Sequence, residues 1–404
     1  MFMKMLHLTI LVSFLFPLIA CGNGDYEQWN GSGVPGNGNG NNQEQVTPSA
    51  NRWAEFADSC TFVLVENYLD KNTGTFWSSV RDIDHDSDYI YWQQAHAMDV
   101  LLYSWRRIKD ANPELAGTYK TYFRKWYDND ANNYNNSHDS EGEYGGFYND
   151  WTDDMAWICL TLLRMSDFTG EALYASTAKE VYDHYIKTRM TTSAKGSCLP
   201  WTSRDEDKTN FNACTNVPSC LVAALLYNRF KKQAYLDDAK ALYSFNIKNM
   251  PDEERVEEPS LSYTQGTFAE AARVLFHITG EQSYMDKAAQ VLLYGLESNR
   301  TTNGGLLRSE GENMDQSIFK AVFIPYAVNY VLDADADVNN ARLIKEKLLK
   351  NAEALYKHID RTYYPSMFCN YWWGEAVPQG SRVSMGAQAS GASLIENVAR
   401  MVEK

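Results

Sequence analysis

The chain has 404 residues and a formal net charge of −15 at pH 7. This charge argues against the phosphate backbone of a nucleic acid as the partner, because like charges repel. The 44% hydrophobic content is enough for one large core or two domains. The 11 Trp and 26 Tyr form a heavy aromatic load, and aromatic rings serve both to fill cores and to stack on the C–H faces of sugars.

Residues 1–20 are predicted to be a secretory signal peptide, since a basic start is followed by an apolar run too short to span a bilayer comfortably. The run ends at Ala20, and the Cys21 that follows resembles a bacterial lipobox. We therefore expect Cys21 to become the lipidated N-terminus, with an ordinary signal peptide and an incidental cysteine as the alternative. Residues 21–50 are rich in Gly and Asn without apolar periodicity, which predicts a flexible tether.

A lipid anchor on such a tether would hold the globular part away from a membrane. The expected location is the bacterial outer membrane, as a lipoprotein on the cell surface or the periplasmic face. No segment after the tether is apolar enough to span a bilayer. Residues 51–404 are predicted to form one folded domain after the tether, and we expect a monomer.

Residues 51–404 show helical periodicity almost throughout and no convincing strand alternation. The expected helices cover residues 51–70, 87–109, 113–127, 151–167, 170–190, 214–230, 232–249, 263–279, 281–299, 316–333, 338–359 and 384–402. Connections are long after every odd-numbered helix and short after most even-numbered ones. The even-numbered helices are also apolar on more sides, which indicates deeper burial.

This alternation predicts an all-α (α/α)6 toroid, in which six helical hairpins form two concentric rings. The even-numbered helices would form the inner ring, with their N-termini and all long loops at one end. A helical bundle or a repeat solenoid also alternates helix pairs and is the alternative. A solenoid does not explain why amides, aromatic rings and charges precede all six inner helices.

Two adjacent carboxylates, Asp153 and Asp154, open the fourth helix between Trp151 and Trp157. An Asp at a helix start commonly caps free N–H groups, but capping accounts for only one of the two. Neighbouring Cα atoms lie about 3.8 Å apart, so the carboxyl groups can approach the separation of roughly 5 Å that retaining glycosidases use. Repulsion would raise the pKa of one carboxyl, so that one acts as an acid while the other stays ionised.

The loops around this pair offer amides, aromatic rings and few charges, which suits a polyhydroxylated ligand. The candidate substrate-binding residues are Trp92, Gln93, Gln94, Asn149, Trp151, Trp157, Asn210, Asn216, Tyr263, Gln265, Phe319 and Lys320. Core packing is the alternative for each aromatic side chain, and turn formation or internal hydrogen bonding is the alternative for the amides. Lys320 could instead be a solvated helix start, and His96 a core histidine.

The sequence predicts no metal and no cofactor. Residues 82–88 and 333–337 repeat Asp at every second position, like the start of a calcium loop, but both lack the turn glycine and the final Glu. The cysteine spacings match no zinc pattern. An even number of cysteines after the tether permits disulfides in an exported chain, and Cys198 and Cys214 could bracket a loop.

Several motifs together resemble one known family. They are Trp92-Gln93-Gln94-Ala95-His96, Tyr148-Asn149-Asp150-Trp151-Thr152-Asp153-Asp154-Met155-Ala156-Trp157, Lys208-Thr209-Asn210, Cys214-Thr215-Asn216-Val217-Pro218, Tyr263-Thr264-Gln265-Gly266 and Phe319-Lys320. Over residues 50–402 the chain resembles glycoside hydrolase family 76, the bacterial and fungal α-1,6-mannanases. The Asp pair between tryptophans is the most specific motif. The family usually has Tyr-Asn-Gln-Gly, so Thr264 could alter one sugar contact.

The resemblance implies an (α/α)6 toroid that cleaves internal α-1,6-mannosidic bonds with retention, with Asp153 as nucleophile and Asp154 as acid/base. The expected substrate is an α-mannan polysaccharide or oligosaccharide. The residues themselves agree, since helix-start N–H groups favour an ionised Asp153. The negative neighbour and the apolar Trp157 would raise the pKa of Asp154. Spacing alone does not exclude the reverse assignment.

Two other functions stay open at this point. An unsaturated glucuronyl hydrolase or a polysaccharide lyase could use the same toroid, but it needs a basic cleft for uronate carboxylates. The motifs offer only Arg204, Lys208 and Lys320 against many acidic residues. A lipid-anchored, helical glycan-binding protein without catalysis needs aromatic rings but no paired carboxylates.

Overall fold

The computed structural model describes residues 50–403 except 79–90, 134–143, 145, 364–365 and 382. The expected signal peptide, the lipid attachment at Cys21 and nearly all of the tether lie outside the described residues. The acidic repeat at residues 82–88 lies outside them as well. The N-terminal part of the helix expected at 87–109 also falls there, and its described part begins at Trp92.

The described chain is built mainly of helices, and the sequence prediction of an all-α fold is confirmed. The α-helices are α1 (Ala50–Tyr68), α2 (Trp92–Ile108), α3 (Pro113–Asn133), α4 (Thr152–Thr169), α5 (Ala172–Val181), α6 (Ala213–Phe230), α7 (Gln233–Asn249), α8 (Ser262–Thr279), α9 (Gln282–Glu297), α10 (Met314–Val331), α11 (Val338–His358) and α12 (Met385–Glu403). The helix expected at 170–190 is α5 followed by a π-helical turn, Tyr182–Ile186, and a short 3-10 turn, Lys187–Arg189.

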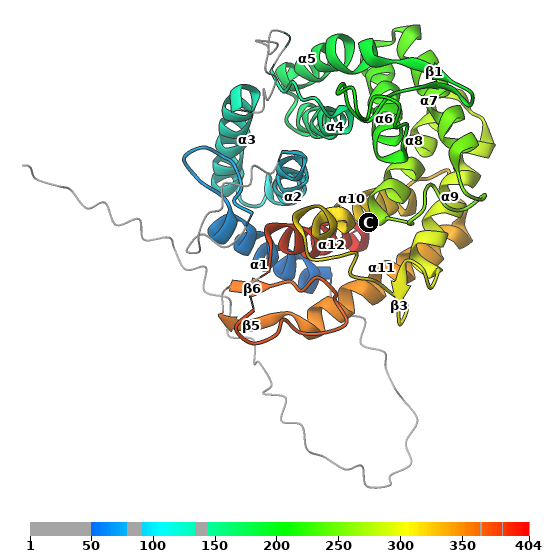
Figure 1. The fold of residues 1–404 in the computed structure, drawn as a ribbon. Helices are drawn as coiled ribbons and strands as arrows, with labels where there is room; N and C mark the ends of the chain where they lie inside the picture. The colour runs from blue at the N-terminus through cyan, green and yellow to red at the C-terminus, as the bar shows by residue number, and fades with distance from the viewer. Residues whose placement is uncertain are drawn as a thin grey trace, which may run out of the picture. The chain divides into compact units, whose positions relative to one another are not determined.

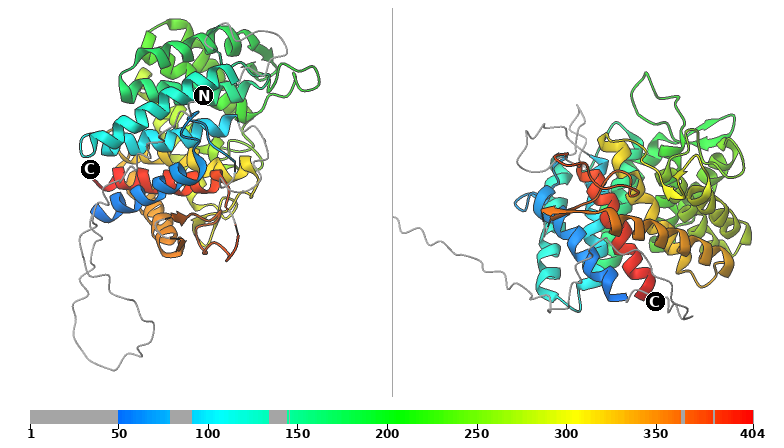
Figure 2. Two further views of the ribbon diagram at one scale, coloured as in Figure 1. Left: turned by 90° about the vertical axis from the view of Figure 1, so that its left-hand side faces the viewer. Right: turned by 90° about the horizontal axis from the view of Figure 1, so that it is seen from below.

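The even-numbered helices form a closed inner ring (Figure 1). Each of them packs against the next, from α2 through α4, α6, α8 and α10 to α12, and α12 returns to α2. The odd-numbered helices lie outside: α3, α5, α7 and α9 each pack on the inner helix that precedes them, and α11 packs on α10 and α12. Figure 2 shows α1 beside α12 from two further directions. The described part of residues 50–403 therefore forms the predicted (α/α)6 toroid.

Burial explains why the two rings differ in sequence. Most residues of α4, α6 and α10 are buried, because an inner helix is surrounded by neighbouring helices. An outer helix such as α11 buries only one stripe, made of Ile344, Leu348, Asn351, Ala352 and Leu355. Although the inner helices are apolar, none of the described helices is long and apolar enough to cross a membrane.

Three small antiparallel ribbons lie in the long loops, where no strand was expected. They are β1 (Thr191–Ser193) with β2 (Gly196–Cys198), β3 (Thr302–Asn303) with β4 (Leu306–Leu307), and β5 (Asp360–Tyr363) with β6 (Ser366–Phe368). Strands of two to four residues are too short to show a period of two in the sequence. Gly304 and Gly305 both have positive φ, which suits the two-residue turn between β3 and β4.

Small residues allow the inner helices to approach one another closely. A Cβ atom on Gly266 of α8 would lie 2.7 Å from the Cα atom of Phe323 on α10. A Cβ atom on Gly386 of α12 would lie 2.1 Å from Oγ of Ser317, also on α10. Gly266 belongs to the Tyr-Thr-Gln-Gly motif, so this motif position serves the packing of the ring.

We expect Gly266→Ala to lower the free energy of unfolding by about 1–3 kcal/mol, because the backbone of α10 must move to admit the new methyl group. Gly117→Ala on α3 is the matched control, since nothing lies within 4 Å of its added Cβ. This control should raise the free energy of unfolding by about 0.5–1 kcal/mol through its better helix propensity. Denaturant unfolding of both variants measures the difference, and equal effects would contradict the packing argument.

Candidate active site

A pocket of about 380 Å³ lies at the N-terminal ends of the inner helices. Its lining includes both predicted catalytic carboxylates, Asp153 and Asp154. The predicted ligand contacts that line it are Trp92, Gln93, Trp151, Trp157, Tyr263 and Phe319. The structure thus brings side chains from α2, α4, α8 and α10 together, as the convergence of inner-helix N-termini requires.

The segment that leads into α4 is fixed by neighbouring loops. Trp151 forms an antiparallel bridge with Thr202. The Asp150 carboxylate pairs with Arg204, with 3.0 Å between Oδ2 and Nε, and the Arg204 guanidinium lies 4.1 Å from the Trp151 ring centre. Arg189 donates to the Asp150 carbonyl at 2.7 Å. Asp150 is therefore held by a salt bridge behind the carboxylate pair, and its backbone is pinned in place.

Asp153 lies in the first turn of α4 and accepts two side-chain hydrogen bonds. Its Oδ2 accepts from Trp201 Nε1 at 3.2 Å and from the Cys214 thiol at 3.4 Å. Burial raises the pKa of Asp153 to about 7, although these two bonds and the backbone N–H groups of Asp153 and Asp154 act in the opposite direction. The sequence argument expected the helix start to keep this carboxyl ionised, but here burial outweighs that stabilisation.

The surroundings of Asp154 disfavour a negative charge more strongly than those of Asp153 do. Burial raises its pKa well above the ordinary value, and the carboxylates of Asp153 and Asp315 raise it further. Asp315, at the start of α10, accepts hydrogen bonds from Trp92 Nε1 at 3.0 Å and from the Gln93 amide. Near neutral pH a proton on the Asp pair is therefore held preferentially by Asp154, as a general acid requires.

Several pocket residues were missed by the sequence analysis. They are Tyr91, Trp201, Cys214 and Asp315. Each lies in a segment that was recognised as leading into an inner helix, so position at an inner N-terminus was the available signal. Nothing in the sequence indicated that Trp201 and Cys214 would donate to Asp153, because this requires the loop after β2 to fold over α4.

The floor of the pocket is a cluster of aromatic rings. The Tyr263 and Phe319 rings stack with 4.1 Å between centroids, and Trp92 stacks on Phe319 at 5.9 Å. Trp157, only 1% exposed, lies 6.2 Å from Trp92 and 5.8 Å from Tyr263. These rings pack on one another and also face the pocket, so core packing and ligand contact are not exclusive here.

Two predicted sugar-binding amides instead hold loops. The Gln94 side chain accepts from the Phe76 N–H at 2.8 Å and donates to the Phe76 carbonyl at 2.7 Å. Asn216 does the same with Leu199, at 2.8 Å and 3.0 Å. Neither amide lines the pocket, because both of its polar ends are occupied by the backbone of the loop that precedes its helix. The structure corrects the expected ligand contact to loop anchoring.

Asn149 and Lys320 also differ from the expected ligand contacts. Asn149 is buried, and its Oδ1 accepts from the Trp151 N–H at 2.9 Å, which forms a local turn. Lys320 is only 2% exposed, and its ammonium donates to the Tyr371 carbonyl at 2.5 Å and lies 4.0 Å from the Trp373 ring centre. Burial lowers the pKa of Lys320 to about 8. Lys320 neither lines the pocket nor faces solvent.

The remaining candidates lie outside the pocket lining. Asn210 is exposed on the loop before α6. Gln265 is fully buried, and its side chain has no hydrogen-bond partner among the described residues. His96 is buried against Asp99, with 3.4 Å between Nδ1 and Oδ2, and burial lowers its pKa. His96 is thus a neutral core histidine, one of the two roles that the sequence left open.

Three possible metal donors come together in the described residues, on His277, Asp333 and Asp335. Asp333 Oδ2 already pairs with Arg273 Nη1 and with His277 Nε2, each at 2.6 Å. Asp337 caps α11 by accepting from two backbone N–H groups. Protein partners therefore account for Asp333 and Asp337 of the acidic repeat at 333–337. All six cysteines of the described chain are free, so Cys198 and Cys214 are not joined.

Comparison with protein families matches residues 52–403 to the family described as glycosyl hydrolase family 76. The matched range contains the carboxylate pair and all the pocket residues. Comparison with curated proteins gave no match.

Solved structures share the fold. The α-1,6-mannanase of Salegentibacter sp. HEL1_6 aligns with a TM-score of 0.72 at 24% identity, covering 86% of this chain and 99% of that one. An inactive variant of that mannanase, with two consecutive aspartates replaced by alanine, was solved in complex with α-1,6-mannotetrose; it aligns with a TM-score of 0.72 at 23% identity, covering 86% and 99%. The family 76 mannosidase Bt3792 of Bacteroides thetaiotaomicron aligns with a TM-score of 0.68 at 18% identity, covering 87% and 99%.

We expect Asp154→Asn to stabilise the protein, with a larger gain at pH 8 than at pH 5. A carboxyl whose folded pKa is raised contributes stability below its unfolded pKa and loses it as pH rises through the folded value. The uncharged amide removes that loss, and the gain in free energy of unfolding at pH 8 should be on the order of 1 kcal/mol. The exposed Asp205→Asn is the control and should show no such gain. Thermal unfolding at both pH values tests this, and equal gains would contradict it.

Proposed function

The chain belongs to glycoside hydrolase family 76, and from this premise we propose that it is a retaining endo-α-1,6-mannanase that cleaves the backbone of α-mannan. The observation that carries the proposal is the placement of Asp153 and Asp154 in one pocket, with unequal surroundings for their two charges. Family membership establishes a glycosidase. The substrate, the stereochemistry and the internal position of cleavage are the proposal.

In the proposed first step, the Asp153 carboxylate attacks the anomeric carbon while Asp154 donates its proton to the departing glycosidic oxygen. The C–O bond to the leaving sugar breaks, and a glycosyl ester forms on Asp153. Asp154, now ionised, then takes a proton from a water molecule. The resulting hydroxide oxygen attacks the same carbon, releases Asp153, and gives a product of unchanged anomeric configuration.

The surroundings of each carboxyl support this division of roles. Asp153 accepts hydrogen bonds from Trp201 and Cys214, which stabilise a negative charge. Asp154 lies beside two carboxylates, Asp153 and Asp315, which favour its protonated form. The reverse assignment would place the charged nucleophile where the local field opposes charge.

The pocket chemistry supports a neutral sugar chain. Among the residues that the structure describes, no Lys or Arg lines the pocket, whereas Asp153, Asp154 and Asp315 do. A uronate substrate would be repelled by these carboxylates, which weighs against the glucuronyl hydrolase and lyase alternatives. The α-1,6-mannotetrose bound to the Salegentibacter mannanase variant supports a site that spans several sugar units, as internal cleavage requires.

We expect Asp153→Asn and Asp154→Asn each to lower kcat on debranched α-1,6-mannan at least about a thousandfold. Asp150→Asn is the matched control, because Asp150 precedes the same helix but pairs with Arg204 outside the pocket lining. On an aryl α-mannoside with a good leaving group, Asp154→Asn should keep formation of the glycosyl-enzyme, since that step needs no proton donor.

Products separated by size decide the mode of cleavage. A ladder of oligosaccharides indicates endo cleavage, whereas mannose alone would indicate exo action and refute the endo proposal. The anomeric proton resonances of the first product report retention. Full activity in both aspartate variants, or mannan binding without reducing-sugar release by the unaltered protein, would refute the catalytic assignment and favour a glycan-binding protein.

We expect kcat/KM to rise with pH through about 7, where Asp153 ionises, and to fall at higher pH, where Asp154 loses its proton. Asp315→Asn removes a negative charge that favours the protonated form of Asp154. The alkaline limb of the profile should therefore move to lower pH, while the acidic limb moves less. An unchanged alkaline limb would show that Asp315 does not tune the acid.

A further inference from the structure

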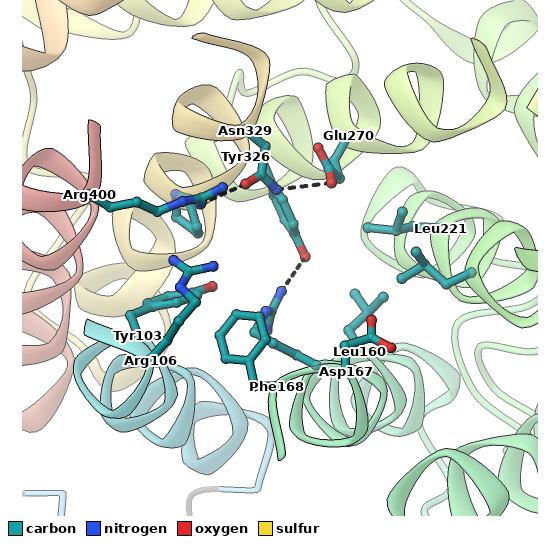
Figure 3. A pocket seen from close by; sticks show the side chains of 13 residues that line it. Tyr103, Arg106, Leu160, Asp167, Phe168, Leu221, Glu270, Tyr326, Asn329 and Arg400 are labelled. Carbon is teal, nitrogen blue, oxygen red and sulfur yellow. Dashed lines mark hydrogen bonds between the residues drawn. The ribbon is translucent and has the colours of Figure 1, made fainter. Parts of the chain in front are cut away.

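A second cavity, of about 140 Å³, lies within the inner ring toward the C-terminal ends of its helices (Figure 3). All six inner helices contribute to its wall, from Arg106 on α2 to Arg400 on α12. Gln93 lines the catalytic pocket, and Arg106 lines this cavity thirteen residues later on the same helix. At 1.5 Å per residue this separation is roughly 20 Å, so the two sites are distinct.

Charge pairing around the cavity is incomplete. Each carboxylate in its wall or beside it already has an arginine partner. The pairs are Asp99 with Arg164, Glu270 with Arg273, Asp167 with Arg229, and Glu396 with Arg107. Arg106 and Arg400 belong to no ion pair in the described part of the chain. No carboxylate in the described part of the chain forms a salt bridge with either guanidinium group, although Glu396 acts electrostatically on Arg106 and Glu270 acts on Arg400.

The two groups are held in place by neutral neighbours. The Arg106 guanidinium lies 4.5 Å from the ring centre of Phe168. Arg400 Nη1 donates to Asn329 Oδ1 at 2.8 Å, and the Asn329 amide in turn donates to Glu270 at 3.0 Å, which turns its carbonyl toward Arg400 (Figure 3). The bond to Asn329 satisfies one N–H of the Arg400 fork, and the others stay available for a ligand.

The electrostatics agree with this geometry. Burial is the largest cause that lowers the pKa of Arg106 to about 10; repulsion from Arg400 and Arg164 acts in the same direction, and Tyr103 and Glu396 act against it. Burial likewise lowers the pKa of Arg400. An anion between the two groups would remove the repulsion and recover part of the hydration that burial takes from them.

We propose that this cavity is a binding site for a tetrahedral oxyanion, phosphate or sulfate, held between Arg106 and Arg400. Guanidinium forks bind such oxygens with paired, charge-assisted hydrogen bonds. The space suffices, since one water molecule needs only roughly 10–15 Å³ of such volume. The Tyr103 side chain in the same wall adds an aromatic face beside the cation.

Isothermal titration calorimetry of the full chain with inorganic phosphate, and separately with sulfate, tests the proposal. We expect one saturable site, and a dissociation constant raised about tenfold or more in Arg106→Gln and in Arg400→Gln. Arg106→Lys keeps the charge but loses the fork and should also bind more weakly. Arg342→Gln, which removes the same charge from an exposed position on α11, is the matched control and should bind like the unaltered chain.

Mannose 6-phosphate as a third ligand separates the two sources of the oxyanion. Tighter binding of the ester indicates a sugar-linked group, and tighter binding of inorganic phosphate indicates the free ion; both support the site. Glycosidase activity should persist in the arginine variants, because the catalytic pocket lies elsewhere, and circular dichroism checks their fold. The absence of saturable binding, or equal affinity in the arginine variants and the Arg342→Gln control, would overturn the proposal and leave the arginines as partners of the helix ends.

Discussion

The carboxyl groups of Asp153, which is buried, and of Asp154, which is half-buried, face the same pocket, and this unfavourable arrangement governs the rest of the site. Two like charges in one pocket repel, and none of the described residues that line it carries a positive side chain to offset them. The protein instead supplies weak donors to one carboxyl, through Trp201 and Cys214, and a third carboxylate, Asp315, near the other. As a consequence, the Asp153–Asp154 pair keeps a proton to higher pH than two exposed carboxyl groups would. An acid and a nucleophile of the same residue type are thereby distinguished by their surroundings.

The toroid makes this arrangement possible because it brings the N-termini of all inner helices to one mouth. Positive helix ends there tolerate the three carboxylates of the pocket. Side-chain amides on the inner helices hydrogen-bond to the backbone of the long loops at this mouth. Gln94 accepts from the Phe76 N–H, and Asn216 accepts from the Leu199 N–H. These two amides could have bound a sugar, but they fix the loops instead. A fixed loop holds Trp201 where its N–H donates to Asp153.

Sequence periodicity was sufficient for the helices and for their division into two rings, since a surrounded helix and a one-sided helix differ in apolar pattern. The carboxylate pair was also recognisable, because capping could not account for two adjacent acids. The direction of individual side chains was not predictable. Gln93 and Gln94 are neighbours of the same type, yet one lines the pocket and the other binds a loop. Successive helix positions point in different directions, and only the path of the preceding loop decides which of them meets the backbone.

The charged side chains inside the ring differ between its two ends. Carboxylates are the charged groups that line the catalytic pocket at the positive ends of the helices, whereas Arg106, Arg164 and Arg400, together with Asp167 and Glu270, line the second cavity toward their negative ends. Between the two lies a buried, charge-balanced layer in which Asp99 contacts His96, accepts from Thr161 and pairs with Arg164. At each end the charged side chains compensate the partial charges of the helix ends, but they do so to different extents. The acids of the pocket are partly neutralised by protons, whereas an arginine cannot lose its proton near neutral pH. The positive charges of Arg106 and Arg400 therefore persist near neutral pH, and a bound oxyanion of the kind proposed above would balance them.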